Sequence, residues 1–246
     1  MDRLIYSSLS AMKAAMARQT TTANNLANVN TSGFRAEMTS SQALWMKGDG
    51  LDARAPTSEE VSSADMTDGA VVETGRDLDV AIQGSAMLAV QSKDGEESYT
   101  RRGDLQVSDS GLLTTGDGAP VLGDGGPITL PPASKVTIAS DGTISIVPVG
   151  GDPAQPQIVD RLKLVQANGV GIAKGMDGLF RVRAGGTLPA DPQGKVKQGA
   201  LEGSNVNTSA TLVDMIEASR DWDMQVKMLA AAQEIDKASA DLMRME

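Results

Sequence analysis

The sequence predicts an α+β fold: long N- and C-terminal α-helices that pair as a coiled coil, with an antiparallel all-β domain inserted between them. Three observations lead to this prediction. Near the N-terminus, apolar residues return at spacings of three or four, which is the period of one helix face. The segment 210–245 contains neither glycine nor proline. Between these ends, short apolar segments alternate with turn residues, as they do in antiparallel sheets.

The N-terminal part, residues 1–34, is expected to be a helix that ends in a turn. Turn-forming residues and a glycine occupy 28–33, which is where a helix ends. Asn24, Asn25 and Asn28 lie in or just after the last turns. Asparagine is a mediocre helix former, so this grouping indicates hydrogen bonds to other groups. The helix face is narrow and rich in methionine and alanine, so the helix needs a packing partner to be stable.

Residues 35–75 are expected to form an irregular connector, because proline and several glycines break any long helix there. The β-domain is expected over residues 76–200. Asp-Gly pairs separate many of its short segments, and such pairs are strong cues for tight turns. These pairs also suggest calcium loops, but none fits the pattern that an EF-hand requires. The predicted strand segments are Leu78–Ile82, Met87–Val90, Leu105–Val107, Leu112–Thr115, Ile128–Leu130, Val136–Ile138, Thr143–Val147, Leu162–Val165 and Leu179–Val182.

The C-terminal part, residues 201–246, is expected to be a long helix. Asn207, Thr208 and Ser209 are all good N-cap residues. The apolar stripe that follows shifts around the helix toward its C-terminal end. Pairing this helix with the N-terminal one gives a helical core domain, and the inserted β-domain makes that arrangement economical.

Composition argues against several classes of function. The chain has 246 residues, a formal net charge of −10 and a pI near 4.6, whereas nucleic-acid binding needs a basic footprint. It contains neither cysteine nor histidine. The commonest general base and the commonest metal ligand are therefore both missing. We expect no catalytic residue, no metal site and no cofactor.

Two patterns in the sequence could indicate a binding or catalytic site. The run Gly169–Gly175 resembles a glycine-rich phosphate loop, but its spacing is GxGxxxG and no helix is expected after it. Turns between strands are the favoured interpretation. Neighbouring carboxylates are candidates for acid–base work, although a chain with 32 acidic residues has such neighbours by chance. The carboxylate pairs in question are Asp77/Asp79, Glu59/Glu60 and Glu96/Glu97.

No apolar run approaches the roughly 20 residues that span a bilayer. The first residues also lack a basic stretch followed by a continuous apolar segment, so a cleaved signal peptide is not expected. If the protein leaves the cytoplasm, it is expected to use another route.

Three regions of the chain, in the right order, resemble a known family. The signature Ala23–Phe34, ANNLANVNTSGF, is similar to the N-terminal signature of the flagellar rod and hook proteins. The stretches Arg76–Ile82 and Tyr99–Gly103 resemble the β-region of that family, and Leu201–Asn207 resembles the start of its C-terminal helix. One departure lies at 208–211, where relatives often carry a different run.

Within the family, the opening Met1–Tyr6 and the run Trp222–Met228 most resemble the proximal-rod members. The resemblance implies a structural subunit of the bacterial flagellar basal-body proximal rod, which polymerises helically to form part of the drive shaft and export channel. A distal-rod subunit is the alternative in the same class. A secreted coiled-coil adhesin or effector is the alternative from another class, and an enzyme is the remote third.

The resemblance also implies partners and a location. The partners are other copies of the chain, neighbouring FlgB-, FlgC- and FlgG-type rod subunits, and the flagellar type III export apparatus. No nucleic acid and no direct membrane insertion are implied, and the location is the periplasmic rod of the basal body. We expect residues 4–28 and 210–245 to be largely disordered or loosely paired in the single chain, and ordered only in the assembled rod. The side chains expected at subunit interfaces are Ile5, Leu9, Met12, Met16, Asn24, Asn25, Leu26, Asn28, Leu212, Met215, Trp222, Val226, Leu229, Ile235 and Leu242.

Overall fold

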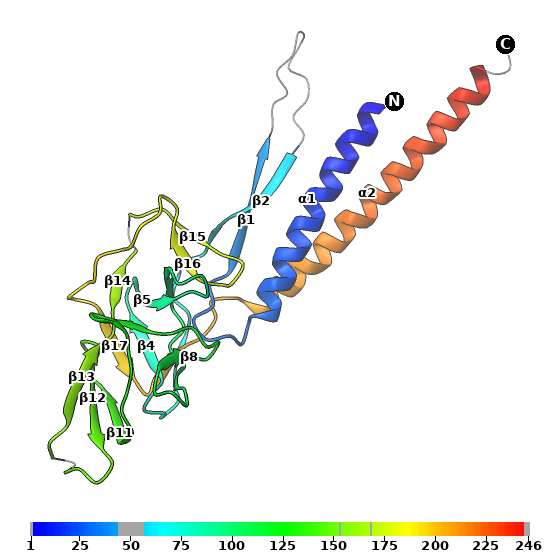
Figure 1. Ribbon diagram of the computed structural model, residues 1–246. Helices are drawn as coiled ribbons and strands as arrows, with labels where there is room; N and C mark the ends of the chain where they lie inside the picture. Colours follow the sequence, from blue (N-terminus) through cyan, green and yellow to red (C-terminus); the bar gives the residue numbers. More distant parts are fainter. Residues whose placement is uncertain (1, 44–56, 153, 168, 244–246) are drawn as a thin grey trace. The chain divides into compact units, whose positions relative to one another are not determined.

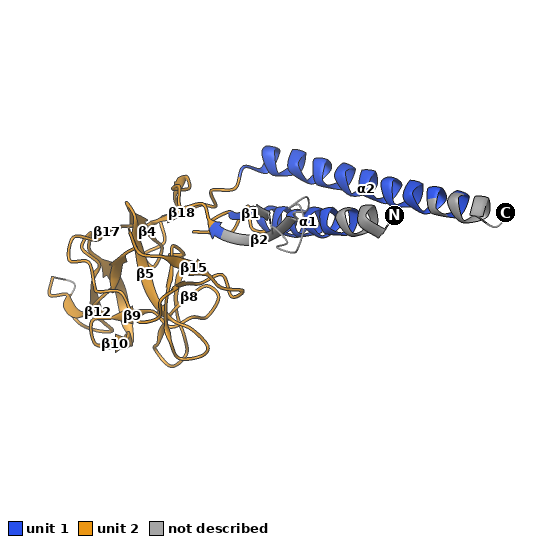
Figure 2. Cartoon of the chain, turned by 90° about the horizontal axis from the view of Figure 1, so that it is seen from above, with its two compact units in different colours: residues 1–27, 37–63, 207–246 blue, residues 28–36, 64–206 orange. Residues whose placement is uncertain are grey.

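The computed structural model describes residues 2–43, 57–152, 154–167 and 169–243 (Figure 1). The chain divides into two compact units (Figure 2). Unit 1 contains residues 1–27, 37–63 and 207–246, and unit 2 contains residues 28–36 and 64–206. The chain therefore passes from one unit to the other four times.

Unit 1 consists of two helices and a β-hairpin arm. Its elements are α1 (Asp2–Ala27), β1 (Glu37–Ala43), β2 (Thr57–Ala64) and α2 (Thr208–Met243), and β1 pairs with β2. Of the three candidate N-cap residues, Asn207 caps α2: its Oδ1 accepts a hydrogen bond of 3.1 Å from the backbone N–H of Ala210. Asn25 near the end of α1 exchanges two hydrogen bonds with the backbone of Glu37, which ties α1 to β1.

The prediction that the terminal helices pair as a coiled coil is wrong. The helices lie side by side in unit 1 (Figures 1 and 2), but the apolar side chains assigned to a shared seam face solvent. Leu9, Met16, Leu212, Val226 and Ile235 are 42–59% exposed. A coiled coil requires large apolar knobs at its seam, whereas the buried helical side chains here are small or polar: Ser8, Ala14, Ala15, Thr21, Thr211 and Ala218.

Periodicity led to this error for a physical reason. On α2 the large apolar residues are spread around the helix, and Val213, Ile216 and Met224 are as exposed as the predicted stripe. Spacing alone does not say whether the large or the small residues of a helix meet its neighbour.

Unit 2 is built from antiparallel strands. Its largest sheet has five strands in the order β14-β5-β6-β16-β15, and a second has the order β11-β12-β13. Four two-stranded pairs complete the described part: β17-β4, β18-β3, β7-β8 and β10-β9. The bounds are β3 (Val71–Glu73), β4 (Val80–Gln83), β5 (Ala86–Gln91), β6 (Glu97–Thr100), β7 (Leu105–Val107), β8 (Leu113–Thr115), β9 (Leu122–Gly123), β10 (Gly126–Pro127), β11 (Ala133–Ile138), β12 (Thr143–Pro148), β13 (Gln157–Arg161), β14 (Leu164–Gln166), β15 (Ile172–Lys174), β16 (Phe180–Val182), β17 (Lys195–Gln198) and β18 (Ala200–Glu202).

The core of unit 2 lies on both faces of β5. Successive side chains of a strand point to opposite faces. Leu88 and Val90 therefore enter a large aliphatic cluster, while Met87 and Ala89 enter a second cluster that includes Tyr99. The continuous apolar run that the sequence shows at this point is typical of a strand covered on both faces.

A predicted Asp-Gly turn joins β11 to β12. Gly142 has a φ of +86°, a conformation that favours glycine. Its N–H donates to the Ala139 carbonyl at 2.9 Å. The Asp141 carboxylate accepts hydrogen bonds from the N–H and hydroxyl of Thr143, at 3.0 and 2.8 Å, which lower the pKa of Asp141. Turn chemistry thus accounts for this pair without a bound cation.

Candidate functional site

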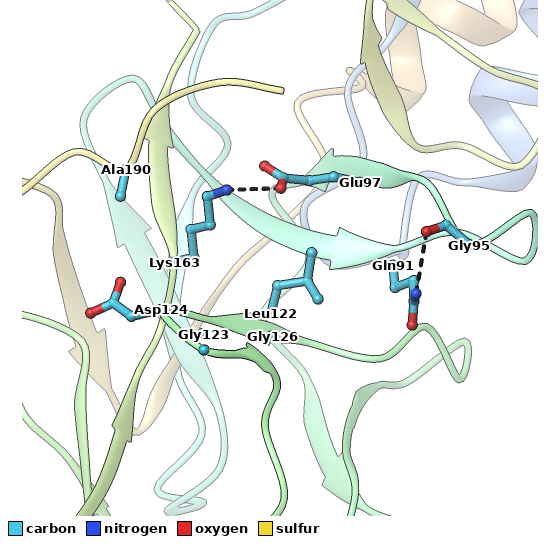
Figure 3. A pocket seen from close by; sticks show the side chains of 10 residues that line it. Gln91, Gly95, Glu97, Leu122, Gly123, Asp124, Gly126, Lys163 and Ala190 are labelled. Atoms are coloured by element: carbon cyan, nitrogen blue, oxygen red, sulfur yellow. Dashed lines mark hydrogen bonds and ion pairs between the residues drawn. The ribbon is translucent and has the colours of Figure 1, made fainter. Parts of the chain in front are cut away.

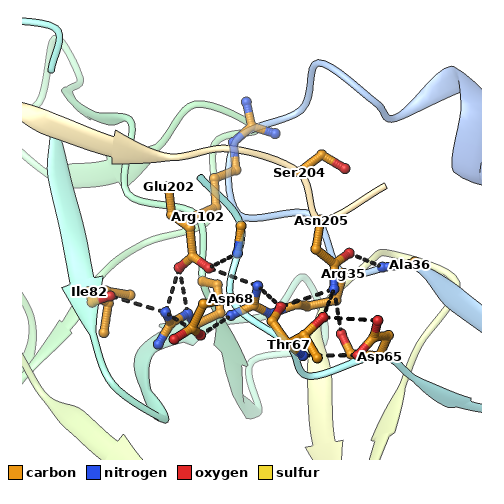
Figure 4. Close-up of polar contacts among 12 residues, drawn as sticks. Arg35, Ala36, Asp65, Thr67, Asp68, Ile82, Arg102, Glu202, Ser204 and Asn205 are labelled. Carbon is orange, nitrogen blue, oxygen red and sulfur yellow. Dashed lines mark hydrogen bonds and ion pairs between the residues drawn. The ribbon is translucent and has the colours of Figure 1, made fainter. Parts of the chain in front are cut away.

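Three of the stretches singled out in the sequence meet in unit 2, around a group of buried charges (Figure 4). We call Arg35, Asp68, Arg101 and Glu202 the charge cluster. Arg35 directly follows the signature, Arg101 lies in the stretch Tyr99–Gly103, and Glu202 ends β18. The three side chains other than Asp68 are almost completely buried, whereas that of Asp68 is 59% exposed.

Glu202 is the centre of the charge cluster. Its Oε1 accepts from Arg35 Nη1 at 2.7 Å and from the Gly69 N–H at 2.9 Å. Its Oε2 accepts from Arg101 Nη2 at 2.5 Å and from Arg101 Nε at 2.8 Å. Its backbone carbonyl accepts from the Gly33 N–H at 2.7 Å. A buried carboxylate needs this degree of compensation, because an unpaired charge in the interior is very costly.

Arg101 extends the cluster into the sheet. Its guanidinium donates to three backbone carbonyls, those of Ile82, Gly84 and Ala86, at 2.5–3.0 Å. These carbonyls belong to β4, the turn after it and the first residue of β5. Burial lowers the pKa of Arg101, and the negative charge of Glu202 opposes that shift.

Arg35 ties the signature to the loop 65–69. Its Nη1 donates to the Thr67 carbonyl at 2.6 Å, and its Nη2 contacts Asp68 Oδ1 at 3.0 Å. The same Asp68 oxygen lies 3.3 Å from Arg101 Nη2. Two cations therefore face two carboxylates, and the cluster is balanced in charge.

Asn205 makes a second tie beside the charge cluster. Its Oδ1 accepts from the Ala36 N–H at 2.7 Å, while its Nδ2 donates to the carbonyls of Asp65 and Thr67 at 2.9 and 3.0 Å. One amide side chain therefore connects the segment after the signature, the loop 65–69 and the segment before α2.

Two glycines allow the segments to approach this closely. Gly33 has a φ of +65°, and a Cβ placed there would lie 2.3 Å from the Arg101 carbonyl carbon. A Cβ at Gly69 would lie 2.1 Å from the Gly203 oxygen. Backbone atoms cannot move aside as a flexible side chain can. The glycine of the signature is therefore required by its conformation and by its packing.

A separate cleft of about 610 Å³ opens in unit 2 beside β9 and β10 (Figure 3). Glu97 and Lys163 line it and pair with each other at 2.8 Å. Behind Glu97, the buried Tyr99 hydroxyl donates to Glu97 Oε1 at 3.0 Å and accepts from the Leu188 N–H at 2.6 Å. Burial raises the pKa of Tyr99 to about 12. These three polar groups are therefore hydrogen-bonded or paired with one another.

The charge cluster is an arrangement that holds backbone segments together. Its cations and carboxylates are mutually paired, and it contains no nucleophile beside a general base. Over the described ranges, no group of three or more acidic residues is placed to hold a metal ion. The chemistry of the site is that of a tie between segments far apart in the sequence.

The residues predicted at subunit interfaces fall into three sets. Exposed side chains are Leu9, Met16, Asn24, Leu212, Val226 and Ile235; partly buried ones are Met12, Asn25, Leu26, Asn28, Met215, Trp222 and Leu229. The side chains of Ile5 and Leu242 lie outside the described residues. The charge cluster does not include any of these residues.

Sequence reasoning did not identify Arg35, Arg101, Glu202 or Asn205 as site residues. A signal was present, because Arg101, Glu202 and Asn205 occur in stretches quoted for the family resemblance and Arg35 follows the signature directly. A charged residue in such a stretch deserves a search for a buried partner of opposite sign in another stretch.

Three families of known proteins match successive parts of the chain. Residues 5–35 match the family described as flagella basal body rod protein, residues 81–146 match the flagellar hook protein FlgE/F/G D1 domain, and residues 197–242 match the flagellar basal body rod FlgEFG protein C-terminal family. Each of the three matches contains or adjoins a member of the charge cluster.

Relatives that match over nearly the whole chain are also flagellar basal-body rod proteins. The flagellar basal-body rod protein FlgF of Salmonella typhimurium is 42% identical over 100% of both chains, and FlgF of Escherichia coli is 44% identical over 94% of both. FlgG of Bacillus subtilis is 33% identical over 99% of this chain and 100% of its own length. The chain therefore belongs to the family of flagellar basal-body rod proteins.

Proposed function

We infer that this chain is a structural subunit of the bacterial flagellar basal-body rod. The observation that carries this inference is the match to FlgF relatives at 42% and 44% identity over nearly the whole length. The family is structural, so the chain is not an enzyme. Its location is the flagellar basal body. Across the described residues, no helix has the length and apolarity needed to cross a membrane.

The subunit type is FlgF rather than FlgG. FlgF relatives match the chain at 42% and 44% identity, whereas the FlgG relative from Bacillus subtilis reaches 33%. We therefore propose a place in the proximal rod, next to FlgB- and FlgC-type subunits on one side and FlgG-type subunits on the other. Export by the flagellar type III apparatus is part of the same proposal.

Assembly is proposed to bury the apolar side chains that α1 and α2 expose. Leu9 and Met16 on α1, and Leu212, Val226 and Ile235 on α2, are exposed in the single chain. Large apolar side chains that recur along two helices favour contacts with other subunits. Helical assembly requires head-to-tail contacts that do not close on themselves, so different faces of one subunit would meet in the rod.

The charge cluster is proposed to anchor the four passages between the units. The chain changes units after residues 27, 36, 63 and 206. The cluster and Asn205 tie together residues 33–36, 65–69 and 202–205, which adjoin the last three passages and lie close to the first. Fixing these points within unit 2 would define where the chain leaves α1 and where it enters α2.

Deleting the gene, and replacing it with substituted versions, tests the proposal. Deletion is expected to abolish motility and to leave basal bodies that lack the rod beyond its base, as seen by electron microscopy.

Val226→Asp and Leu26→Asp should also block incorporation of the subunit into the rod, because each would place an unpaired charge in a buried interface. Val149→Asp is the matched control, since Val149 is exposed but lies in unit 2. Normal motility in both helix variants would contradict the assembly role of these faces. A complete rod in the deletion strain would contradict the function itself.

A further inference from the structure

Six Asp-Gly pairs lie within the described residues, and the peptide bond of such a pair is open to a spontaneous reaction. The backbone nitrogen of the glycine attacks the side-chain carboxyl carbon of the aspartate. A C–N bond forms, the nitrogen loses its proton, a C–O bond breaks, and one molecule of water leaves a cyclic imide. Water then adds to either carbonyl of the imide and gives aspartate or isoaspartate. In isoaspartate the backbone runs through the side chain.

Hydrogen bonding of the glycine nitrogen distinguishes the six pairs. The peptide must turn before its nitrogen faces the carboxyl carbon, and a hydrogen bond donated by that nitrogen opposes the turn. In five pairs the glycine N–H donates such a bond, at 2.8–3.0 Å. The acceptors are Glu202 Oε1 for Gly69, and the backbone carbonyls of Ser92, Thr115, Ala139 and Gly175 for Gly95, Gly118, Gly142 and Gly178 respectively.

The sixth pair, Asp124-Gly125, is different. It forms the two-residue turn between β9 and β10, where Gly123 pairs with Gly126. With the residues that the structure describes, neither the Gly125 N–H nor the Asp124 carboxylate makes a hydrogen bond. Both residues are exposed at the rim of the cleft of about 610 Å³, and no dashed line reaches Asp124 in Figure 3.

The turn also has room to rotate. No atom lies within 4 Å of the position that a Cβ would take at Gly125 or at Gly126. Glycine reaches more backbone conformations than any other residue. The pair Asp94-Gly95 is more constrained, because Gly95 is held on both sides. Its N–H donates to the Ser92 carbonyl, and its own carbonyl accepts from Gln91 Nε2 at 3.2 Å.

We propose that Asp124-Gly125 is the pair at which the folded chain forms isoaspartate, because among the described pairs the fold leaves this glycine nitrogen free to attack. The product carries one additional methylene in the backbone of a two-residue turn. The pairing of Gly123 with Gly126 then changes, and the rim of the cleft changes with it. This inference does not rest on the rod assignment.

Peptide mapping of the aged, folded chain is the first test. The purified protein is incubated at mildly acidic pH, where a protonated carboxyl loses water more easily than a carboxylate does. Mass spectrometry with electron-transfer fragmentation then separates aspartate from isoaspartate peptides of equal mass. Isoaspartate at 124 should accumulate at least about fivefold faster than at the other five positions, because an ordinary hydrogen bond lowers the reactive fraction by about that factor. Equal or faster accumulation at another of the six positions would overturn the proposal.

Incubation in water enriched in the heavy oxygen isotope identifies the route. Hydrolysis of the imide should place one heavy oxygen in the peptide that contains residue 124. Isoaspartate without the heavy oxygen would contradict the imide.

The same incubation in urea separates the fold from the local sequence. Unfolding removes the hydrogen bonds that hold the other five glycines, so the preference for Asp124 should largely disappear. An undiminished preference in urea would show that the fold does not select this pair.

Two substitutions test the attacking atom. Gly125→Ala fits the turn, because Gly125 has no positive φ and open space around its Cβ position. Its methyl group hinders the attack, so most of the isoaspartate at 124 should be lost. Asp124→Glu keeps the charge but requires a larger ring, so isomerisation at 124 should stop. In both variants the other five positions should be unchanged, and circular dichroism establishes that unit 2 is folded. Undiminished isoaspartate at 124 in Gly125→Ala would contradict attack by the Gly125 nitrogen.

Discussion

The two units place their apolar side chains differently. Unit 2 buries its aliphatic residues in two clusters on either face of β5, and even its buried charges are paired. Unit 1 buries mainly small residues on its helices and leaves large apolar ones exposed, such as Met16 and Ile235. An isolated helix is marginal in water, because most of its stability comes from packing. Unit 2 thus carries its own stabilising contacts, whereas unit 1 is suited to obtain them from neighbours.

The largest expected effect tests how strongly unit 2 depends on its buried charges. Glu202→Ala would leave Arg35 and Arg101 buried without their main counter-charge, so it should lower the free energy of unfolding by about 3–5 kcal/mol in urea titrations. Glu73→Gln is the control, because Glu73 pairs with Lys197 at 2.6 Å on the surface and should change nothing measurable. Equal midpoints for the two variants would mean that the charge cluster does not hold unit 2 together.

A smaller effect is expected at the signature glycine. Gly33→Ala forces a side chain into a left-handed conformation and against the Arg101 backbone, so it should cost about 3 kcal/mol. Gly118→Ala is the matched control: Gly118 has a φ of +85° but open space around its Cβ position, so about 1 kcal/mol is expected. If the two substitutions cost the same, the close approach at Gly33 has no energetic weight.

The two units differ in how much of their structure the sequence predicts. The run Met87–Val90 predicts a buried strand. The strand forms because its side chains are apolar on both faces of the sheet, and both faces are covered. The Asp141-Gly142 turn follows from local chemistry in the same way. The partners of Arg35 did not follow, because a chain with 32 acidic and 22 basic residues allows many pairings until the fold is known. The coiled coil was mispredicted because helical period does not reveal which residues a neighbour covers.

A still smaller effect on stability is expected from Tyr99, and only at alkaline pH. The pKa of Tyr99 is about 12 in the folded state, against an ordinary value of 10.0, because its hydroxyl is buried. Below about pH 10 the hydroxyl is protonated in both states, and this contribution to stability is complete. Between pH 10 and 12 only the unfolded state loses the proton, so stability should fall as pH rises.

Thermal unfolding across that pH range measures the effect. Tyr99→Phe should be less stable at neutral pH, because the buried Leu188 N–H loses its acceptor. It should nevertheless lose less additional stability between pH 10 and 12 than the unaltered chain. Parallel curves for the two proteins would contradict the buried, neutral hydroxyl.

The smallest effect is expected on the exposed face of α2. In the purified single chain, Val226→Asp should change the free energy of unfolding of unit 2 by less than about 0.5 kcal/mol, because the side chain lies in unit 1 and is exposed. A urea titration that follows the strands of unit 2 measures this. A loss comparable to that of Glu202→Ala would mean that the face is already used within the chain.

Amide hydrogen exchange along the purified single chain tests the contrast between the units most directly. Exchange reports the free energy of local opening, segment by segment. The strands at the centre of unit 2, β5 and β6, should exchange slowly and together. The amides of α1 and α2 should exchange much faster, and should become protected when the chain is incorporated into rods. Protection of both helices in the single chain as strong as that of β5 and β6 would contradict the account, because unit 1 would then be complete without neighbouring subunits.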